Sequence, residues 1–467
     1  MSLPKHPQYE ANLAVWEKMR DCYDGEDAIK VKGVDYLSPT AGMELDGALT
    51  STTSQGYKTY VRYKERAVFH ELVSGAVELM LGLLHFREPL INLPTELEPL
   101  RQNCTKYGES LKNYLRRINE AQLVTGRIGS LVDIRETSVG DMPYFVTYSA
   151  EACINWSEGD AEIELEDPDL SLVALDETHQ KMIMETLSRE TVEQYRVLEV
   201  LDGIYQTATG TNWPMTMWEA PSLQGRSLSY IPFVFVNSRD TLPDIDVPPL
   251  RSLANTAVSM YRSEADYRQS LHMQGQDTLV IKGGDDQKTY RIGSGASILT
   301  PVDGDAKFIG VTSTGLPEQR TALLNDMAKG KELSSRLVSS GFSHAESGEA
   351  LRIRVGSQTA TLGSIASASA RALEFQLKAA AEFLGTTGEG ISVVPNMNFI
   401  DGTLTGNELV KLLEAKNLGA PISLETLHVL MKRNNLTNFE LDQELKKIAS
   451  EASLIKEDEE PNDSNAS

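Results

Sequence analysis

Three long helical segments in the second half of the chain, separated by two short interruptions, constrain its fold most. Apolar residues recur at helical spacing over residues 249–274, over 316–337, and over a longer stretch that ends at Leu384. The first interruption is rich in glycine and contains two strand-like runs, whereas the second, residues 339–348, is built mainly of small residues. The pattern predicts two helices joined by a compact β-rich insertion, followed by a third and much longer helix.

The rest of the chain mixes helical and strand patterns. Amphipathic or apolar helical spacing is found before and after these long helices, and short runs rich in β-branched and aromatic residues lie between them. The predicted helical segments are 8–23, 63–86, 99–120 and 405–449, and the predicted strands are 144–148, 194–205, 213–218, 230–236, 278–281 and 296–299. A hairpin turn is predicted at 210–212, and capping boxes pair Thr405 with Glu408 and Thr437 with Glu440. The predicted fold class is therefore α+β, mainly helical.

Charge and hydropathy narrow the functional classes. The 467 residues carry a net charge of −23, and affinity for nucleic acid comes largely from Lys and Arg, so a protein that grips DNA tightly is not expected. An acidic chain is nevertheless compatible with a conduit that DNA slides past. No apolar run is long enough to span a bilayer, and the N-terminus lacks the order of a signal peptide, so we expect a cytoplasmic protein with no membrane partner.

The residue patterns of common catalytic and metal sites do not occur in the sequence. The Gly330–Lys331 pair is followed by Glu332 instead of the Ser or Thr of a phosphate-binding loop. The seven histidines show no metal-ligand spacing, and the three cysteines, Cys22, Cys104 and Cys153, stand far apart. We therefore predict a structural protein with no catalytic residues, no cofactor and no metal.

Three stretches and the order of the elements resemble the portal proteins of tailed bacteriophages. The stretches are HPQYEANLAVWEKMRDCYDGEDAIK near the start, YKERAVFHELVSGAVELMLGLLHFREP at 63–89, and HAESGEALRIRVGSQTATLGSIASASARALEFQLKAAAEFLG at 344–385. Their amino-acid sequences are similar to those of a portal subfamily formerly of unknown function. The resemblance implies a phage portal fold with wing, stem, clip and crown regions, and covers the chain to about Thr437.

Carried onto this sequence, the resemblance divides the chain into eight parts. These are an N-terminal wing (1–248), first stem helix (249–275), clip (276–315), second stem helix (316–338), tunnel loop (339–348), long backbone or wing helix with a following strand (349–402), helical crown (403–450) and disordered acidic tail (451–467).

The same resemblance implies a homo-oligomeric ring, usually of twelve subunits, at one capsid vertex of the virion, assembled in the host cytoplasm. Genome packaging and ejection would take place through its channel, with double-stranded DNA passing non-specifically. The implied partners are the large terminase, which supplies the ATPase, the head-to-tail adaptor, and the major capsid and scaffold proteins.

Candidate contact residues follow from the implied regions. The DNA-channel candidates, which lie at the end of the second stem helix and in the tunnel loop, are Lys329, Lys331, Arg336, Ser340, Phe342 and His344. The candidates for docking partners at the clip are Lys282, Asp285, Asp286, Lys288 and Arg291. An ordinary surface loop and solubilising helix charges are the alternative readings of these residues.

Two further questions stay open at this level. The apolar segment 68–84 and the Ala-rich segment 359–384 offer apolar surface for contacts between ring subunits, and the alternative is that both form the core of a single chain. The alternative functions are another phage scaffold, adaptor or capsid-associated structural protein, and an acidic cytoplasmic enzyme of an unrecognised type.

Overall fold

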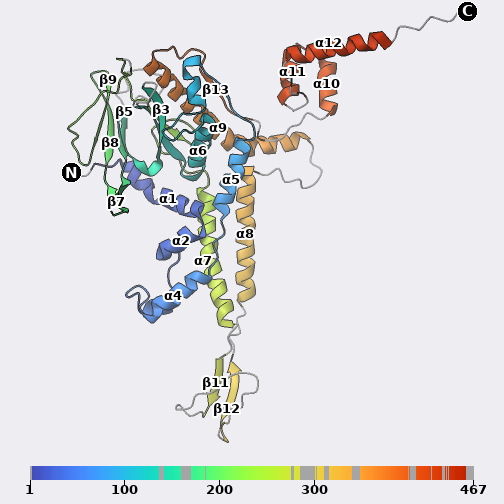
Figure 1. Ribbon diagram of the computed structural model, residues 1–467. Helices are drawn as coiled ribbons and strands as arrows, with labels where there is room; N and C mark the ends of the chain where they lie inside the picture. The colour runs from blue at the N-terminus through green and yellow to red at the C-terminus, as the bar shows by residue number, and fades with distance from the viewer. Residues whose placement is uncertain are drawn as a thin grey trace, which may run out of the picture. The chain divides into compact units, whose positions relative to one another are not determined.

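The computed structural model describes residues 3–135, 141–158, 170–184, 186–223, 225–274, 278–283, 300, 302–309, 315–338, 348–397, 399, 406–421, 423–433, 437, 439 and 441–458. The chain divides into two units, Met1–Phe399 and Ile400–Ser467. Helices and strands are mixed in the first unit, whereas the described part of the second is helical, as the predicted α+β class requires (Figure 1).

Helices form the N-terminal part of the first unit. Their bounds are α1 (Pro7–Asp24), α2 (Glu26–Lys32), α3 (Ala41–Leu45), α4 (Gln55–Arg66), α5 (Leu72–Leu84) and α6 (Leu111–Val124), with short 3-10 turns η1 (Gly33–Asp35), η2 (Thr95–Arg101) and η3 (Ala150–Ala152). The predicted helix 8–23 is confirmed as α1, and His6 caps it because its Nδ1 accepts from the backbone N–H of Gln8.

The single helix predicted over 63–86 is wrong, because the chain breaks between α4 and α5. Ala67 takes an extended conformation after α4, and it is fully buried together with its near neighbour Phe69. Both side chains reach the core because α4 ends at Arg66, before them. The helix predicted over 99–120 divides in the same way, into η2 and α6, and Ser110 caps α6 through its side-chain oxygen.

Antiparallel sheets make up the rest of the first unit. A three-stranded sheet has the order β10-β2-β3 and a four-stranded sheet the order β4-β5-β8-β9, while β1 pairs with β13, β6 with β7 and β11 with β12. The bounds are β1 (Leu90–Asn92), β2 (Arg127–Arg135), β3 (Met142–Ser149), β4 (Cys153–Glu158), β5 (Leu170–Asp176), β6 (His179–Ile183), β7 (Ser188–Val192), β8 (Tyr195–Leu201), β9 (Ile204–Gly210), β10 (Phe233–Asn237), β11 (Thr278–Lys282), β12 (Asp305–Ile309) and β13 (Ser392–Val394).

The predicted strands and turn need correction around residue 200. The runs at 144–148 and 230–236 are confirmed by β3 and β10, but 194–205 contains a hairpin of its own. Asp202 and Gly203, both with positive φ, turn β8 into β9, because a two-residue turn of this kind matches the twist of the paired strands. The chain does reverse after β9, since Thr207 and Glu219 exchange antiparallel backbone hydrogen bonds across the segment that contains the predicted turn at 210–212. The predicted strand at 213–218 is wrong, and the predicted strand 296–299 lies outside the described residues.

A long helix, α9 (Gly348–Leu384), connects the two hydrophobic cores of the first unit. At 1.5 Å per residue, its 37 residues extend about 55 Å. Leu373, Leu377 and Phe383 pack in the core that surrounds the two main sheets, whereas Leu362 and Ile365 pack among the N-terminal helices. The helix is therefore the element around which the unit is organised.

Burial along α5 and α9 shows how much of these apolar helices the chain itself covers. In α5, Val73, Val77 and Met80 are fully buried by the chain itself, and the Ala-rich part of α9 is equally buried in the region whose side chains are described. Both segments therefore contribute to the core of a single chain, as the alternative holds, while Leu79 of α5 remains 52% exposed.

The end of α9 is closed by Gly385, which has φ of +70° and a Schellman pair of hydrogen bonds from Gly385 N and Thr386 N. A Cβ atom here would also overlap the guanidinium of Arg226.

We expect Gly385→Ala to lower the free energy of unfolding by about 1–3 kcal/mol in urea titrations. Gly390 has a similar φ of +83° with open space around it, so Gly390→Ala measures the backbone part alone. Equal losses in the two variants would mean that Arg226 does not restrict the site.

The second unit contains α10 (Gly406–Asn417), α11 (Leu424–Arg433) and α12 (Leu441–Asp458). Gly419, at φ +98°, and Pro421 separate the first two helices, as the sequence predicts. The last helix continues to Asp458 and so includes the beginning of the segment predicted as a tail. Thr405 and Glu440 lie outside the described residues, so neither capping box is observed.

Candidate functional site

Two long helices that lie side by side form what we call the stalk: α7 (Arg251–Gln274) and α8 (Leu316–Val338) (Figure 1). Both helices are close to the predicted bounds. Pro248 and Pro249 precede α7, as is typical of the start of a helix. The backbone of α8 approaches α5 and α7 closely at Gly330, where a Cβ would lie 2.9 Å from Leu72 Cδ1. The absence of a side chain at this position therefore permits the contact.

The rest of the unit covers the base of the stalk, and α4 contacts α7 as far along as Asp266 and Gln269. In the first half of α7, side chains such as Leu253, Ala257 and Tyr261 are fully buried against the N-terminal helices. Towards the end of α7 and the start of α8, apolar side chains become exposed: Leu271 is 41% and Leu324 55% exposed. The stalk therefore leaves the core with an uncovered tip.

Between the stalk helices, the chain forms the hairpin of β11 and β12. Its register pairs Leu279 with Phe308 and Ile281 with Ala306, so one face of the hairpin carries only apolar residues. The other face is mixed and pairs Lys282 with Asp305. Phe308 is 58% exposed, and an isolated two-stranded hairpin is at best marginally stable in water. Among the described residues, Phe308 on this face is open to solvent.

The predicted contact residues are only partly within the described structure. Lys282 is exposed at the end of β11 and Lys329 is exposed on α8, while Lys331 and Arg336 lie on α8 with side chains that are not described. Ser340, Phe342 and His344, and likewise Asp285, Asp286, Lys288 and Arg291, lie outside the described residues. The described residues therefore do not test whether these candidates lie together, and their roles stay predictions.

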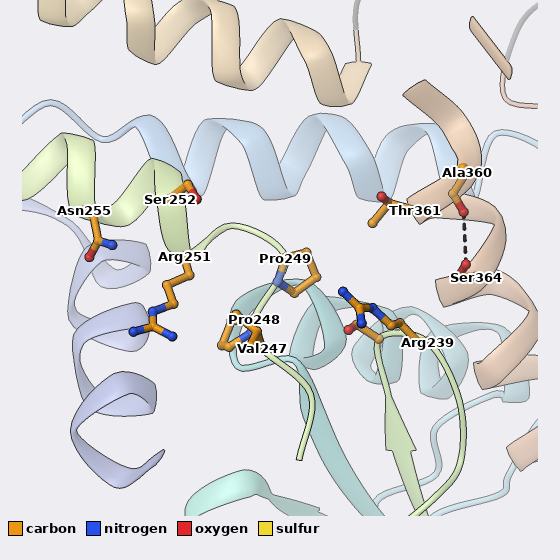
Figure 2. A pocket seen from close by; sticks show the side chains of 11 residues that line it. Arg239, Val247, Pro248, Pro249, Arg251, Ser252, Asn255, Ala360, Thr361 and Ser364 are labelled. Atoms are coloured by element: carbon orange, nitrogen blue, oxygen red, sulfur yellow. Dashed lines mark hydrogen bonds between the residues drawn. The ribbon is translucent and has the colours of Figure 1, made fainter. Parts of the chain in front are cut away.

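A half-open cleft of about 710 Å³ lies where α7 begins beside α9. Figure 2 shows Arg251, Ser252 and Asn255 of α7 on one side, and Arg239 and Thr361 on the other. The cleft is lined by Ser238, Arg239, Val247, Pro248, Pro249, Arg251, Ser252, Asn255, Ala360, Thr361 and Ser364.

The lining chemistry of this cleft favours negative charge. No carboxylate is among the lining residues, and neither Arg239 nor Arg251 has an ion pair within the part of the chain that the structure describes. Asn255 is oriented by Lys18, whose Nζ donates to its Oδ1 at 2.7 Å. Carboxylate or phosphate groups are the ligands that such donors bind. Sequence reasoning missed this cleft because residues near 239, 251 and 361 are distant in the chain.

A second cleft, of about 640 Å³, contains a network of partly buried charges. Arg196 of β8 donates through Nη1 to Asp133 of β2 at 2.9 Å, and its Nε lies 2.8 Å from Glu177 Oε1. Tyr148 of β3 donates to Glu177 at 2.7 Å. Burial would lower the pKa of Arg196, but Tyr148 and the two carboxylates outweigh it and raise that pKa. The charges satisfy one another and join the two main sheets, so this cleft is a structural junction.

Arg127 of β2 makes a different contact between the same sheets. The side chain is fully buried, and its guanidinium lies 3.6 Å from the ring centre of Phe235 in β10 and 4.4 Å from that of Trp156 in β4. Its nitrogens have no hydrogen-bond partner among the described residues. Burial lowers the pKa of Arg127 to about 10, so it remains charged at neutral pH and is stabilised by the two aromatic faces.

His85, half-buried after α5, should make stability depend on pH. Its Nε2 lies 2.9 Å from Asn119 Oδ1, and burial lowers its pKa, so the folded state favours the neutral imidazole. The unfolded chain takes up a proton near pH 6.5, so this contribution is present above that pH and is lost as the pH falls through the lowered folded value. We expect the urea midpoint to fall more between pH 7.5 and 5.5 in the wild type than in His85→Gln. Parallel pH curves would contradict this role.

Other classes of site receive no support from the described residues. Within these ranges, no three His, Cys, Asp or Glu side chains gather in a way that could hold a metal ion. Cys22, Cys104 and Cys153 are buried free thiols, and burial raises the pKa of each to about 12. No described helix is both long and apolar enough to cross a bilayer.

Comparison with known proteins identifies a family match over the stalk and α9. Residues 249–384 match the model of a family described as a domain of unknown function (DUF4055). No curated protein matches the chain. Among solved structures, a chain from the neck of a native gene transfer agent (GTA) particle, computed with C12 symmetry, matches at 14% identity with a TM-score of 0.40.

Two further matches come from similar particles. A chain from the virion of a native gene transfer agent particle is 13% identical with a TM-score of 0.39, and one from the neck of an empty GTA particle, computed with C6 symmetry, is 14% identical with a TM-score of 0.38. Each of the three matches covers 77% of this chain and 89% of the other. TM-scores this low do not establish a common fold.

Proposed function

We propose that this protein is the portal subunit of a tailed phage or phage-like particle, and that its copies form a ring at one capsid vertex. The observation that carries the proposal is the hairpin of β11 and β12, which has one wholly apolar face and follows a stalk whose tip is uncovered. A monomer gains nothing from exposing such a face. Adjacent copies in a ring would cover it.

The order of the elements supports the same reading. A mixed first region, a stalk helix, a small β hairpin, a second stalk helix, a very long helix and a terminal helical unit follow one another in the chain. This is the order of wing, stem, clip, stem, backbone helix and crown that the sequence resemblance implies. In this assignment α7 and α8 are the stem helices, and the hairpin is the clip that docks the terminase and later the adaptor.

The charge of the chain suits a passage for DNA. A net charge of −23 opposes tight binding of phosphates, and the few exposed stalk cations, such as Lys329, permit brief contacts. Packaging and ejection would therefore use the ring as a conduit, with the ATPase supplied by another protein. Major capsid and scaffold proteins would surround the ring at the vertex of the virion.

The proposal is tested by the assembly state of the purified full-length chain. Light scattering after size-exclusion chromatography should give a mass of many subunits, and negative-stain electron microscopy should show rings with a central channel at least about 20 Å wide, enough for B-form DNA. A chain that stays monomeric under capsid-assembly conditions would contradict the proposal. Closed particles without a channel would favour another scaffold or adaptor role.

A further inference from the structure

The cleft at the start of α7 contains two arginines that have no counter-charge in the described part of the chain. Arg239 and Arg251 are exposed and line the cleft, and no described oxygen atom accepts from either guanidinium. Arginines elsewhere in the described structure form ion pairs within the chain, and examples are Arg20, Arg101, Arg196 and Arg268. In a chain with a net charge of −23, two such arginines in one cleft are available to a bound anion.

Two carboxylates close to Arg239 in the sequence are used by the loop that carries it. Asp246 Oδ2 accepts from the backbone N–H of Arg239 at 3.0 Å and from Ser238 Oγ at 3.2 Å. Asp240 Oδ1 accepts from the backbone N–H of Leu242 at 3.0 Å. Neither carboxylate lines the cleft, and neither forms an ion pair with the guanidinium of Arg239 within the described ranges. The positive charge of this side chain therefore remains for a ligand.

One wall of the cleft carries several hydrogen-bond donors on the first turns of α7 (Figure 2). Arg251 and Asn255 are four residues apart, so they lie on the same face of the helix. Lys18 Nζ donates to Asn255 Oδ1 at 2.7 Å, so the amide nitrogen of Asn255 remains as a donor. Ser252, at the second position of the helix, adds a hydroxyl and a backbone N–H that the helix itself does not use. These donors match the several oxygens of one phosphate group.

The opposite wall carries a second set of donors, from Arg239 and from Thr361 of α9 (Figure 2). The volume of about 710 Å³ is typical of a small-molecule site and is much larger than one phosphate ion fills. A carboxylate has two oxygens in one plane, and a single guanidinium can satisfy both, so it would leave most of these donors unused. Donors on two walls instead suit a ligand with one phosphate group for each arginine.

We propose that this cleft binds a ligand with at least two phosphate groups, held between Arg251 on one wall and Arg239 on the other. A free polyphosphate and the backbone of a nucleic acid both supply this chemistry. All the lining residues belong to one chain, so binding does not depend on assembly of the ring.

Isothermal titration calorimetry with inorganic pyrophosphate tests the site in the purified full-length chain. We expect Arg239→Gln and Arg251→Gln each to weaken binding about tenfold or more, because each removes a charge-assisted hydrogen-bond donor. Arg62→Gln is the matched control, since Arg62 is exposed on α4, does not line the cleft and carries the same charge. Equal losses in all three variants would mean that overall charge determines binding, and would overturn the site.

Fluorescence anisotropy with a short labelled DNA duplex distinguishes the two sources of phosphate. Duplex binding that is lost in Arg239→Gln and Arg251→Gln, but kept in Arg62→Gln, would assign the site to backbone phosphates. Pyrophosphate binding that depends on the two cleft arginines, without such a loss for the duplex, would assign it to a free ligand. Succinate bound as tightly as pyrophosphate would overturn the phosphate class, and arginine-dependent binding of neither probe would overturn the proposal.

Light scattering of the same samples separates this inference from the proposed function. A monomer that binds pyrophosphate through Arg239 and Arg251 would support the site and contradict the portal proposal. Rings that bind neither probe through these arginines would overturn the site and leave the portal proposal intact. Monomers without such binding would overturn both.

Discussion

Phe308→Asp is expected to abolish ring assembly while the chain remains folded. The side chain is 58% exposed on the apolar face of the β11–β12 hairpin, so a carboxylate there costs the monomer little. In the ring, the same carboxylate would be buried without a partner, at a cost of several kcal/mol for each subunit. Light scattering should therefore show a monomer mass in place of the ring mass, with an unchanged circular dichroism spectrum.

The opposite face of the hairpin supplies the control for this prediction. Lys307 lies next to Phe308 in β12 but points to the mixed face, where it pairs with Val280 in the register. Lys307→Asp introduces the same residue one position away and should still form rings. If Phe308→Asp assembles as well as Lys307→Asp, the apolar face of the hairpin is not a subunit contact.

Arg196→Met is expected to give the largest loss of stability among changes to single ion pairs. The guanidinium neutralises Asp133 and Glu177, whose side chains are each only 17% exposed, and its removal leaves both carboxylates without a counter-charge. Losing one partner of a largely buried ion pair costs about 2–4 kcal/mol at this level of exposure. Urea unfolding followed by fluorescence should show the loss. Arg196→Lys should recover part of it, because an ammonium group still supplies the charge.

Arg20 provides a comparison at the surface. Its Nη2 lies 2.8 Å from Glu151 Oε2, but its side chain is 44% exposed, so Arg20→Met should cost less than about 1 kcal/mol. A loss for Arg196→Met that is no larger than this would mean that solvent screens the junction, and that the two sheets are held together by apolar packing alone.

The sequence predicted the elements whose signal is local. Helices α1, α7, α8 and α9 were found because apolar residues recur at a spacing that a single helix displays by itself. The sequence pattern did not predict the break between α4 and α5. Ala67 and Phe69 leave the helical conformation because they pack into a core formed by residues that are distant in the sequence. Strand β2 was missed for a related reason. It is the central strand of its sheet, buried over its first six residues, so it lacks the alternation that marks a strand with one exposed face.

The surfaces proposed to be functional show the same difference between what local sequence patterns predict and what tertiary contacts decide. Composition, charge and the order of the elements predicted by themselves an acidic chain in which two long helices flank a β-rich insertion. Only the tertiary structure decided which apolar helices are core and which surfaces remain open, because burial depends on residues that are distant in the sequence. It placed α5 and most of the described α9 inside the chain and left Phe308 of the hairpin exposed. It also brought together Arg196, Asp133 and Glu177, since only the pairing of strands makes neighbours of residues that no local pattern connects.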